Sequence, residues 1–369
     1  MRVATTLTRT LAGTFVGVVA SIAIVMVIAA LRRAPSPPRL VPEDASGPLR
    51  HIAIHYTPAQ NAEALPVWRR LFRALPATVR VSVAVERAED FTAFVDHMRA
   101  AGVRGVDRFE RSVVGHAITT WSRDRMAALA EPAGVLSPPR VTTASGRRAG
   151  DWDAPFAIAR DVYAAQPRIA GLVFEGGDFA ASRTHVFADA NLIGRNLGRG
   201  DATRAHLEAT LRRTFAQDIV WLGDNPGDIP EHHIMMYMVP LDERRVLVGD
   251  VRLGARLAPD TDADADRAGH AKRFDHVAAL LAARGFEVHR VPVVVLPGAG
   301  SYVTYTNALF DSDASGPVVY LPTYGIPALD EAAEDSYVAL GYRVVPIDVS
   351  TIYRLNGSLG CLVNVMARG

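Results

Sequence analysis

The sequence predicts an α/β fold preceded by an N-terminal transmembrane helix. From about residue 51 onward, strand-like and helix-like segments alternate along the chain, which is typical of strand–helix–strand units. Hydrophobic residues make up 49% of the chain and charged residues 21%, so the composition favours a large core over disorder. The first 40 residues stand apart, because most of them form one long uncharged run.

The uncharged run covers residues 11–31, and its 21 residues contain no Asp, Glu, Lys or Arg. A helix of this length, at about 1.5 Å per residue, matches the roughly 30 Å hydrocarbon core of a bilayer. Arg2 and Arg9 precede the run, and the pair Arg32 and Arg33 behind it is a poor context for signal-peptide cleavage. We therefore expect an uncleaved single-pass anchor and an extracytoplasmic domain, although basic residues on both sides leave the orientation open.

The anchor divides the rest of the chain into three parts. Residues 1–10 would be a short N-terminal tail. Residues 32–50 are rich in Pro and polar groups and are expected to form an extended linker. Residues 51–369 would then form the α/β domain.

Individual elements follow from periodicity and capping. Residues 79–86 alternate strictly in hydrophobicity, as a half-buried strand does, and residues 90–102 begin with Asp90 and end with Gly102, as a helix does. The remaining expected strands are residues 51–56, 171–175, 218–222, 245–251, 291–296, 318–322 and 343–347. The remaining expected helices are residues 60–74, 153–165, 201–215, 266–284 and 328–340.

Composition excludes several kinds of function. Forty basic and 39 acidic side chains leave a net charge of +1, which gives no electrostatic basis for binding nucleic acid. The single cysteine, Cys361, forms no internal disulfide and no zinc cluster. An acidic run from Asp260 lacks the glycine and the acid that a calcium loop needs, since Ala265 and Ala271 stand there. We expect no metal and no cofactor.

Four segments carry residues suited to catalysis. WSRD (121–124) places a carboxylate after an apolar, strand-like stretch, and FEGGDF (174–179) ends a strand in two glycines flanked by carboxylates. Two adjacent histidines lead into a strand pair in 230–250, and NGSLGCLVN (356–364) places the cysteine in a Gly-rich turn. Each segment alone also has an ordinary structural interpretation, such as a buried small thiol or a tight turn.

Together, the order of these segments resembles the guanidine-modifying (pentein) superfamily, which includes arginine, agmatine and peptidyl-arginine deiminases. Those enzymes share an Arg-Asp pair, a Glu-Gly-Gly-Asp turn, a His-x-Asp segment and a late cysteine. Here these correspond to Arg123 with Asp124, 175–178, His233 and Cys361. The similarity runs from about residue 52 and implies a propeller of five ββαβ modules with pseudo-fivefold symmetry. ANLIGRN (190–196) resembles the strand after the Gly-Gly turn.

The resemblance also implies roles for individual residues. Cys361 would be the nucleophile, His233 the general acid and base, and Asp124 the carboxylate that grips the substrate. Glu175 would support His233 or the substrate. Arg123, Asp178 and Asn307 are further candidates for the substrate site, with Asp178 also suited to holding the turn.

The chemistry of a guanidinium group explains why these residue types are needed. Its carbon is a poor electrophile, because the positive charge is spread over three nitrogens. Carboxylates bind the planar N–H fork in bidentate fashion and orient the carbon. A thiolate then attacks that carbon and forms a covalent intermediate.

One departure from the family pattern keeps the function open. The second substrate carboxylate would fall two residues after His233, where Met235 stands, unless Glu231 or Asp228 replaces it. Losing one partner of a desolvated charge pair typically costs about 3–5 kcal/mol. From the resemblance and the apolar run together, we expect a membrane-anchored hydrolase (deiminase) of a guanidino or amidino compound. An amidinotransferase and a non-catalytic binding or sensing domain are the alternatives.

Overall fold

The computed structural model describes residues 36–140, 146–198, 203–259, 269–296 and 301–369. The chain divides into two compact units, Met1–Pro37 and Pro38–Gly369. All helices and strands given below belong to the second unit.

The repeating element of this unit is a ββαβ module. An antiparallel strand pair is followed by one or two helices and by a strand that returns parallel to the second strand. In the module of β8 (Phe179–Ala181), β9 (His185–Asp189) and β10 (Asp218–Leu222), β8 pairs antiparallel with β9, and β9 pairs parallel with β10. Helices α5 (Asn191–Asn196) and α6 (Arg204–Thr214) connect β9 to β10.

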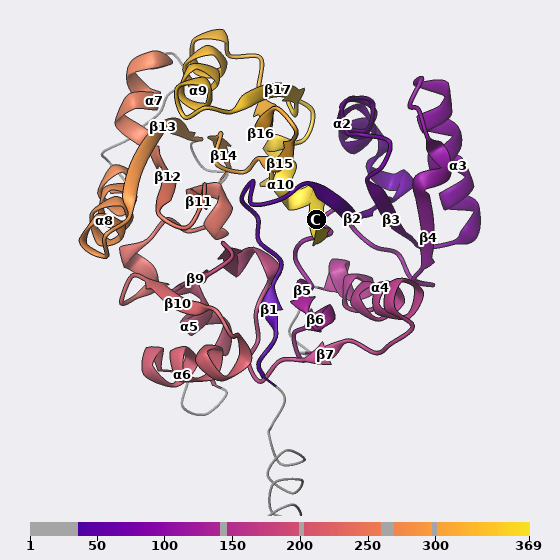
Figure 1. Ribbon diagram of the computed structural model, residues 1–369, viewed down its shortest axis with the longest axis horizontal. Helices are drawn as coiled ribbons and strands as arrows, with labels where there is room; N and C mark the ends of the chain where they lie inside the picture. The colour runs from indigo at the N-terminus through magenta and orange to yellow at the C-terminus, as the bar shows by residue number, and fades with distance from the viewer. Residues whose placement is uncertain (1–35, 141–145, 199–202, 260–268, 297–300) are drawn as a thin grey trace, which may run out of the picture. The chain divides into compact units, whose positions relative to one another are not determined.

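Five sheets of this kind occur within the described residues, and Figure 1 shows them following one another around a common centre with the helices outside. The other four sheets are β1 (Arg39–Leu40), β5 (Ala127–Glu131), β6 (Ala133–Ser137) and β7 (Arg168–Ile169); β11 (Met238–Pro240), β12 (Arg245–Asp250), β13 (Glu287–Val295) and β14 (Tyr302–Thr304); β15 (Leu309–Asp313), β16 (Gly316–Thr323) and β17 (Arg343–Asp348); and β18 (Val363–Arg368), β2 (Leu49–His55), β3 (Arg80–Val85) and β4 (Phe109–Val113). The remaining helices are α2 (Asn61–Ala74), α3 (Ala88–Ala100), α4 (Ala154–Tyr163), α7 (Val251–Leu257), α8 (His270–Ala283), α9 (Pro327–Ala339) and α10 (Leu359–Leu362).

The helices bury apolar faces that the sequence period sets. In α2, Leu65, Trp68 and Phe72 recur at helical spacing and are at most 6% exposed. The Phe72 ring lies 6.0 Å from that of Phe94 in α3 and 5.1 Å from that of Phe109 in β4. These contacts fix both helices of the module against its sheet.

The ring of modules closes where β18 pairs antiparallel with β2, from Val363 opposite Ile54 to Arg368 opposite Leu49. Arg368 supports this closure through its guanidinium, which donates to the carbonyls of Pro42, Gly47 and Phe310 at 2.7, 2.9 and 3.0 Å. The five-module α/β arrangement agrees with the expectation from the sequence.

The predicted transmembrane helix is not supported. Among the described residues, no helix has both the length and the apolar character needed to cross a bilayer. The longest described helices, α2 and α8, have 14 residues each and carry charged side chains, so at about 1.5 Å per residue they fall short of a roughly 30 Å core. The expected anchor, residues 11–31, lies outside the described residues. The single-pass architecture and the localisation that depended on it are therefore wrong for the part of the chain that the structure describes.

Several local expectations differ from the structure. Residues 38–50, expected within a linker, belong to the compact unit, where Leu40 and Leu49 are buried. Residues 171–175 form no strand, because the Asn196 side chain takes up both backbone polar groups of Val173, at 2.9 and 2.8 Å. The segment ANLIGRN is largely helix α5, not a strand.

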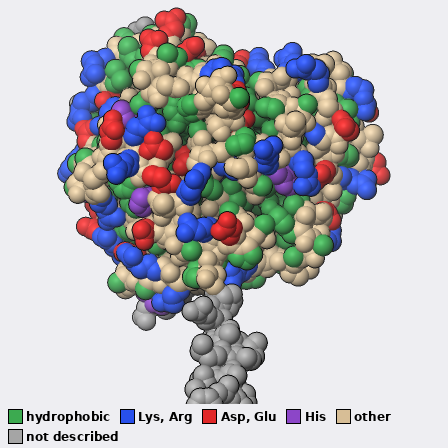
Figure 2. Space-filling view, viewed as in Figure 1, with side chains coloured by type: hydrophobic (Ala, Val, Ile, Leu, Met, Phe, Trp, Pro, Cys, Tyr) green, Lys and Arg blue, Asp and Glu red, His purple; other side chains and the backbone are tan. Residues whose placement is uncertain are grey.

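Three further expectations concern the Arg-Asp pair, the acidic run and the surface charge. Arg123 and Asp124 lie in a turn before β5, not at the end of a strand. The acidic run that lacks the features of a calcium loop, residues 260–266, lies outside the described residues. Figure 2 shows side chains of both charges spread over the visible face, as expected for nearly balanced charges.

Candidate active site

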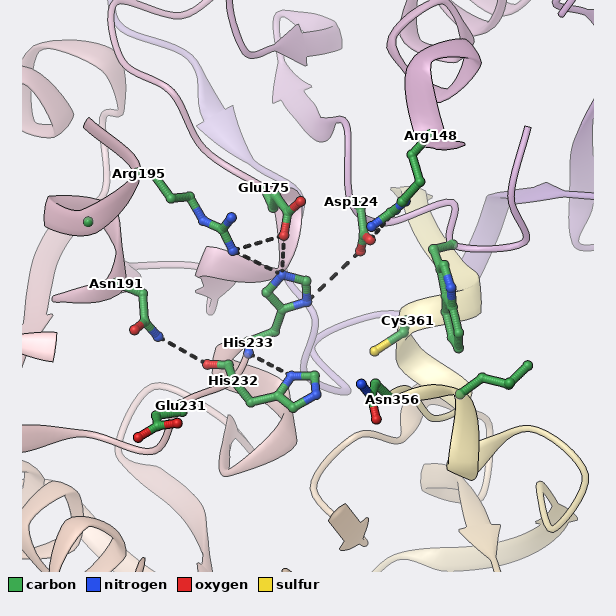
Figure 3. Close-up of a pocket in the computed structure, with 13 residues that line it drawn as sticks. Asp124, Arg148, Glu175, Asn191, Arg195, Glu231, His232, His233, Asn356 and Cys361 are labelled. Atoms are coloured by element: carbon green, nitrogen blue, oxygen red, sulfur yellow. Dashed lines mark hydrogen bonds and ion pairs between the residues drawn. The ribbon is translucent and has the colours of Figure 1, made fainter. Parts of the chain in front are cut away.

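A cavity of about 620 Å³ contains the predicted nucleophile (Figure 3). Its walls come from loops of several modules that are far apart in the sequence. The residues lining it are Trp121, Asp124, Arg148, Glu175, Asn191, Gly194, Arg195, Glu231, His232, His233, Leu355, Asn356 and Cys361.

Cys361 lies in the single-turn helix α10, just before β18. Its residue is only 3% exposed, yet it lines the cavity, and Figure 3 shows the sulfur pointing into it. The amide of Asn307 holds the cysteine from behind. Its Nδ2 donates to Sγ at 3.3 Å, and its Oδ1 accepts from the Cys361 backbone N–H at 3.1 Å.

The Glu-Gly-Gly-Asp turn is shaped by close packing at both glycines. A Cβ on Gly176 would lie 2.1 Å from the Arg123 carbonyl oxygen, and one on Gly177 would lie 2.4 Å from His233 Cγ. Asp178, which is fully buried, closes the turn by accepting from the Glu175 backbone N–H at 2.7 Å. Gly176 therefore allows the turn to pack against the Arg123 backbone, and Gly177 allows it to pack directly against the histidine.

His233 lies between two carboxylates. Its Nε2 is 2.8 Å from Glu175 Oε2, and its Nδ1 is 3.9 Å from Asp124 Oδ1. Burial by itself lowers the pKa of this imidazole. Hydrogen bonds to Cys361 and Glu175, together with the charges of Asp124 and Glu175, outweigh burial and raise the pKa of His233 well above its usual value. The charged form of the imidazole beside the thiol is thereby favoured.

Glu175 remains ionised because cations surround it. Arg125 Nη1 lies 2.6 Å from Oε1, and Arg195 Nη2 lies 2.8 Å from Oε2. Burial raises the pKa of the Glu175 carboxyl. The hydrogen bond and charge of His233 and the charges of the two arginines outweigh this effect and hold that pKa well below its usual value. Arg195 also contacts Asp178, with Nε 2.7 Å from Oδ2.

Asp124 is paired with an arginine of the chain itself. Arg148 Nη2 contacts Asp124 Oδ2, and both side chains line the cavity. The Asp124 backbone carbonyl accepts from the Gly176 N–H at 3.0 Å, which ties the Asp124 loop to the Gly-Gly turn.

His232 links the histidine loop to the cysteine loop. Its Nδ1 accepts from the His233 backbone N–H at 2.9 Å, and its ring bonds to the backbone of Asn356. Burial, with the charge of His233 in support, lowers the pKa of His232 to about 3. His232 is therefore neutral and serves to hold two loops together.

The structure brings together four of the predicted site residues and leaves three outside the cavity. Cys361, His233, Glu175 and Asp124 all line it. The three expected at the substrate do not. Arg123 is buried, pairs with Glu43 and donates to the Phe179 carbonyl at 2.9 Å. Asp178 and Asn307 are fully buried and support the turn and the cysteine, respectively.

No carboxylate stands two residues after His233. Met235 is 3% exposed, does not line the cavity, and its carbonyl accepts from Thr306 Oγ1 at 2.8 Å. Glu231 does line the cavity, with Arg273 Nη1 2.7 Å from its Oε1. Asp228 instead accepts from backbone N–H groups of its own turn.

Sequence reasoning missed the two arginines of the cavity, Arg148 and Arg195, and also His232 as a loop-linking residue. Arg195 lies within ANLIGRN (190–196) and His232 is next to His233, so nearness to these motifs is a signal that could have found both. Arg148 has no motif around it. Among the described residues, no cluster of three or more His, Cys, Asp or Glu is arranged to hold a metal.

Comparison with known proteins agrees with this architecture. Residues 52–366 match the model of the Porphyromonas-type peptidyl-arginine deiminase family. The fold is similar to that of a Campylobacter jejuni agmatine deiminase (TM-score 0.66, 16% identity, covering 90% of this chain and 96% of that one). It is also similar to the agmatine deiminase of Enterococcus faecalis (TM-score 0.65, 15% identity, covering 91% and 99%).

A third solved structure, of a putative peptidyl-arginine deiminase, has a TM-score of 0.67 at 14% identity and covers 90% of this chain and 100% of that one. A search of curated proteins gave no match. The family match covers most of the chain, and the described fold has the five-module architecture of the superfamily. The chain therefore belongs to the Porphyromonas-type peptidyl-arginine deiminase family of the guanidine-modifying (pentein) superfamily.

Proposed function

We propose that this protein is a hydrolase that deiminates a guanidino or amidino compound through a covalent intermediate on Cys361. The observation that carries the proposal is the convergence of Cys361, His233, Glu175 and Asp124 on one cavity. These residues come from four separate segments, so a purely structural role for each would not require them to meet.

The first half of the reaction forms the intermediate. His233 in its protonated form lies beside the thiol, and a neighbouring cation stabilises a thiolate. The Cys361 sulfur attacks the guanidino carbon and a C–S bond forms. As the C–N bond breaks, His233 gives its proton to the departing amine. Glu175, which accepts from His233 Nε2, keeps the imidazole oriented with Nδ1 toward Asp124.

The second half releases the product. The amine leaves, and a water molecule takes its place beside the now neutral His233. His233 accepts a proton from this water as the oxygen attacks the same carbon, the C–S bond breaks, and a ureido product forms. The thiolate and the protonated imidazole are thereby restored.

Substrate binding rests mainly on Asp124. Met235 is buried outside the cavity, and His233 and two arginines engage Glu175. Because Glu231 pairs with Arg273, Asp124 is the carboxylate placed to meet a cationic substrate. Two solved structures of similar fold are agmatine deiminases, so agmatine belongs in any substrate panel with arginine and arginine-terminated peptides.

The test is a screen of guanidino compounds for release of ammonia and of a ureido product. Cys361→Ala and Cys361→Ser should both abolish turnover while the melting temperature stays within a few degrees of wild type. Because Cys361 is the only cysteine, labelling of the thiol by a haloacetamidine reports on this residue alone. Turnover that persists in Cys361→Ala would overturn the proposal.

Two other results would point to the alternatives. If the product forms only when a second amine is supplied, the amine resolves the intermediate and the protein is an amidinotransferase. If wild type binds guanidino compounds but releases no product, and Cys361 remains unlabelled, the protein is a binding domain.

A further inference from the structure

The guanidinium group of Arg148 occupies the carboxylate that a substrate would need. Arg148 Nη2 contacts Asp124 Oδ2 on the wall of the cavity that contains Cys361. Figure 3 shows the two side chains next to each other, with His233 on the other side of the carboxylate. The chain thus supplies its own guanidinium to the predicted guanidinium-binding residue.

The guanidinium of a substrate has to compete with Arg148 for Asp124, because few other carboxylates in the cavity are free. A carboxylate binds a guanidinium best when both oxygens accept from the planar fork. In Asp124, Oδ2 is engaged by Arg148 and Oδ1 lies 3.9 Å from His233 Nδ1. Two arginines and a histidine already surround Glu175. An incoming cation therefore finds the Asp124 position filled.

Arg148 is held at two points, and only one of them blocks the cavity. Its Nε lies 3.1 Å from Asp151 Oδ2. Asp151 is fully buried and accepts from Thr119 N–H and Thr119 Oγ1, both at 2.7 Å, so this anchor is fixed. The Nη end, by contrast, faces the cavity, where the side chain is 23% exposed. Its bond to Asp124 can break while the bond to Asp151 stays.

On the basis of the proposed function, we propose that Arg148 is a specificity-determining residue. It holds the Asp124 position and admits a small cationic guanidino compound only when that compound displaces it. Displacement lowers the apparent affinity by the fraction of time for which Asp124 is free. The like charge of Arg148 at the cavity wall acts in the same direction.

Two reagents with the same reactive carbon test the proposal. 2-Chloroacetamidine is a planar cation that needs Asp124, and 2-chloroacetamide is its neutral counterpart. Both alkylate a thiolate with loss of chloride, and Cys361 is the single thiol. The ratio of the two rate constants measures access of a cation to the site and cancels changes in the thiol itself.

Replacing the arginine should favour the cation. If Asp124 is free about a tenth of the time, Arg148→Gln raises the amidine-to-amide ratio by about tenfold. Arg104→Gln removes an equal charge from an exposed residue that does not line the cavity, and it should leave the ratio unchanged. A ratio that is the same or lower in Arg148→Gln overturns the proposal.

A binding measurement separates this inference from the proposed function. Methylguanidine is titrated by calorimetry into Cys361→Ala and into Cys361→Ala combined with Arg148→Gln, so no reactive thiol is involved. Binding should be about tenfold tighter in the double variant. Unchanged, weaker or undetectable binding there overturns the role of Arg148. Failure of both reagents to modify wild-type Cys361 overturns the proposed function instead. Arg148→Met also removes the cation but keeps a long side chain, and it takes the place of Arg148→Gln if that variant does not fold, with the same expected rise in the ratio.

Discussion

His233 has a strongly raised pKa because two carboxylates and the thiol surround it, despite a burial that favours the neutral ring. A general acid with a raised pKa stays protonated further into the alkaline range. Under the proposed function, the high-pH limit of activity therefore reports on the partners of this one side chain.

Glu175→Gln should move that limit to lower pH. The substitution removes a negative charge 2.8 Å from His233 Nε2, so the pKa of His233 falls and the proton needed by the leaving amine is lost earlier as the pH rises. We expect the alkaline limb of kcat to shift down by about 1–2 pH units. A pH–rate profile measures the shift.

Glu231→Gln is the matched control, because Glu231 lines the same cavity but pairs with Arg273. Its alkaline limb should coincide with that of wild type. An unmoved limb in Glu175→Gln would mean that the acid in the reaction is not His233.

At the residue scale, the sequence was informative where chemistry imposes a motif. Cys361, His233, Glu175 and Asp124 all line the cavity. Arg123 does not, because neighbours along the chain in a turn point in different directions, and its side chain pairs with Glu43. Arg148 follows Asp124 by 24 residues with no pattern between them, so only the fold reveals their contact.

At the scale of elements, the Gly-Gly turn and the histidine loop form one packed unit. A Cβ on Gly177 would lie 2.4 Å from His233 Nδ1 and 2.8 Å from His233 Cβ. Because the clash includes the base of the side chain, rotation of the ring does not relieve it.

Gly177→Ala should therefore displace His233 and lower kcat by at least about a hundredfold, since a misplacement of about 1 Å can have this effect. The matched control is Gly194→Ala. Gly194 lines the same cavity, but a Cβ on it would meet no atom within 4 Å. The control should keep wild-type kcat. Equal activity of the two variants would contradict the packing described above.

The helices were largely predictable, because caps and period are local signals. Helix α9 was expected at 328–340 and is Pro327–Ala339, and α3 was expected at 90–102 and is Ala88–Ala100. The false strand at 171–175 fails for a reason outside its own sequence. A side chain of α5, Asn196, binds the backbone of Val173 where a partner strand would otherwise bind.

At the scale of the whole unit, the ring of sheets is closed by one strand pair. The β18–β2 pair joins distant parts of the chain, and Arg368 in β18 bonds to carbonyls from two other segments, at Pro42 and Phe310. No local pattern predicts this arginine, because its partners lie far away in the sequence.

Arg368→Met should lower the free energy of unfolding by about 3 kcal/mol, since it leaves several partly buried carbonyls without a charged donor. Arg343→Met is the control. Its ion pair with Asp313 joins side chains that are 56% and 43% exposed, so its loss should lower the free energy of unfolding far less than the loss of Arg368. Urea unfolding of both variants gives the comparison, and equal losses would contradict a special role for Arg368.

The position of Cys361 directly before β18 also orders events during synthesis. The cysteine leaves the ribosome with the strand that completes the ring, after Asp124, Glu175 and His233 have already emerged. A nascent chain therefore cannot place the thiol beside the histidine until synthesis has reached Cys361, two residues before β18 begins. In this arrangement, the cysteine of the cavity and the strand that closes the ring are the last parts of the described chain to be made.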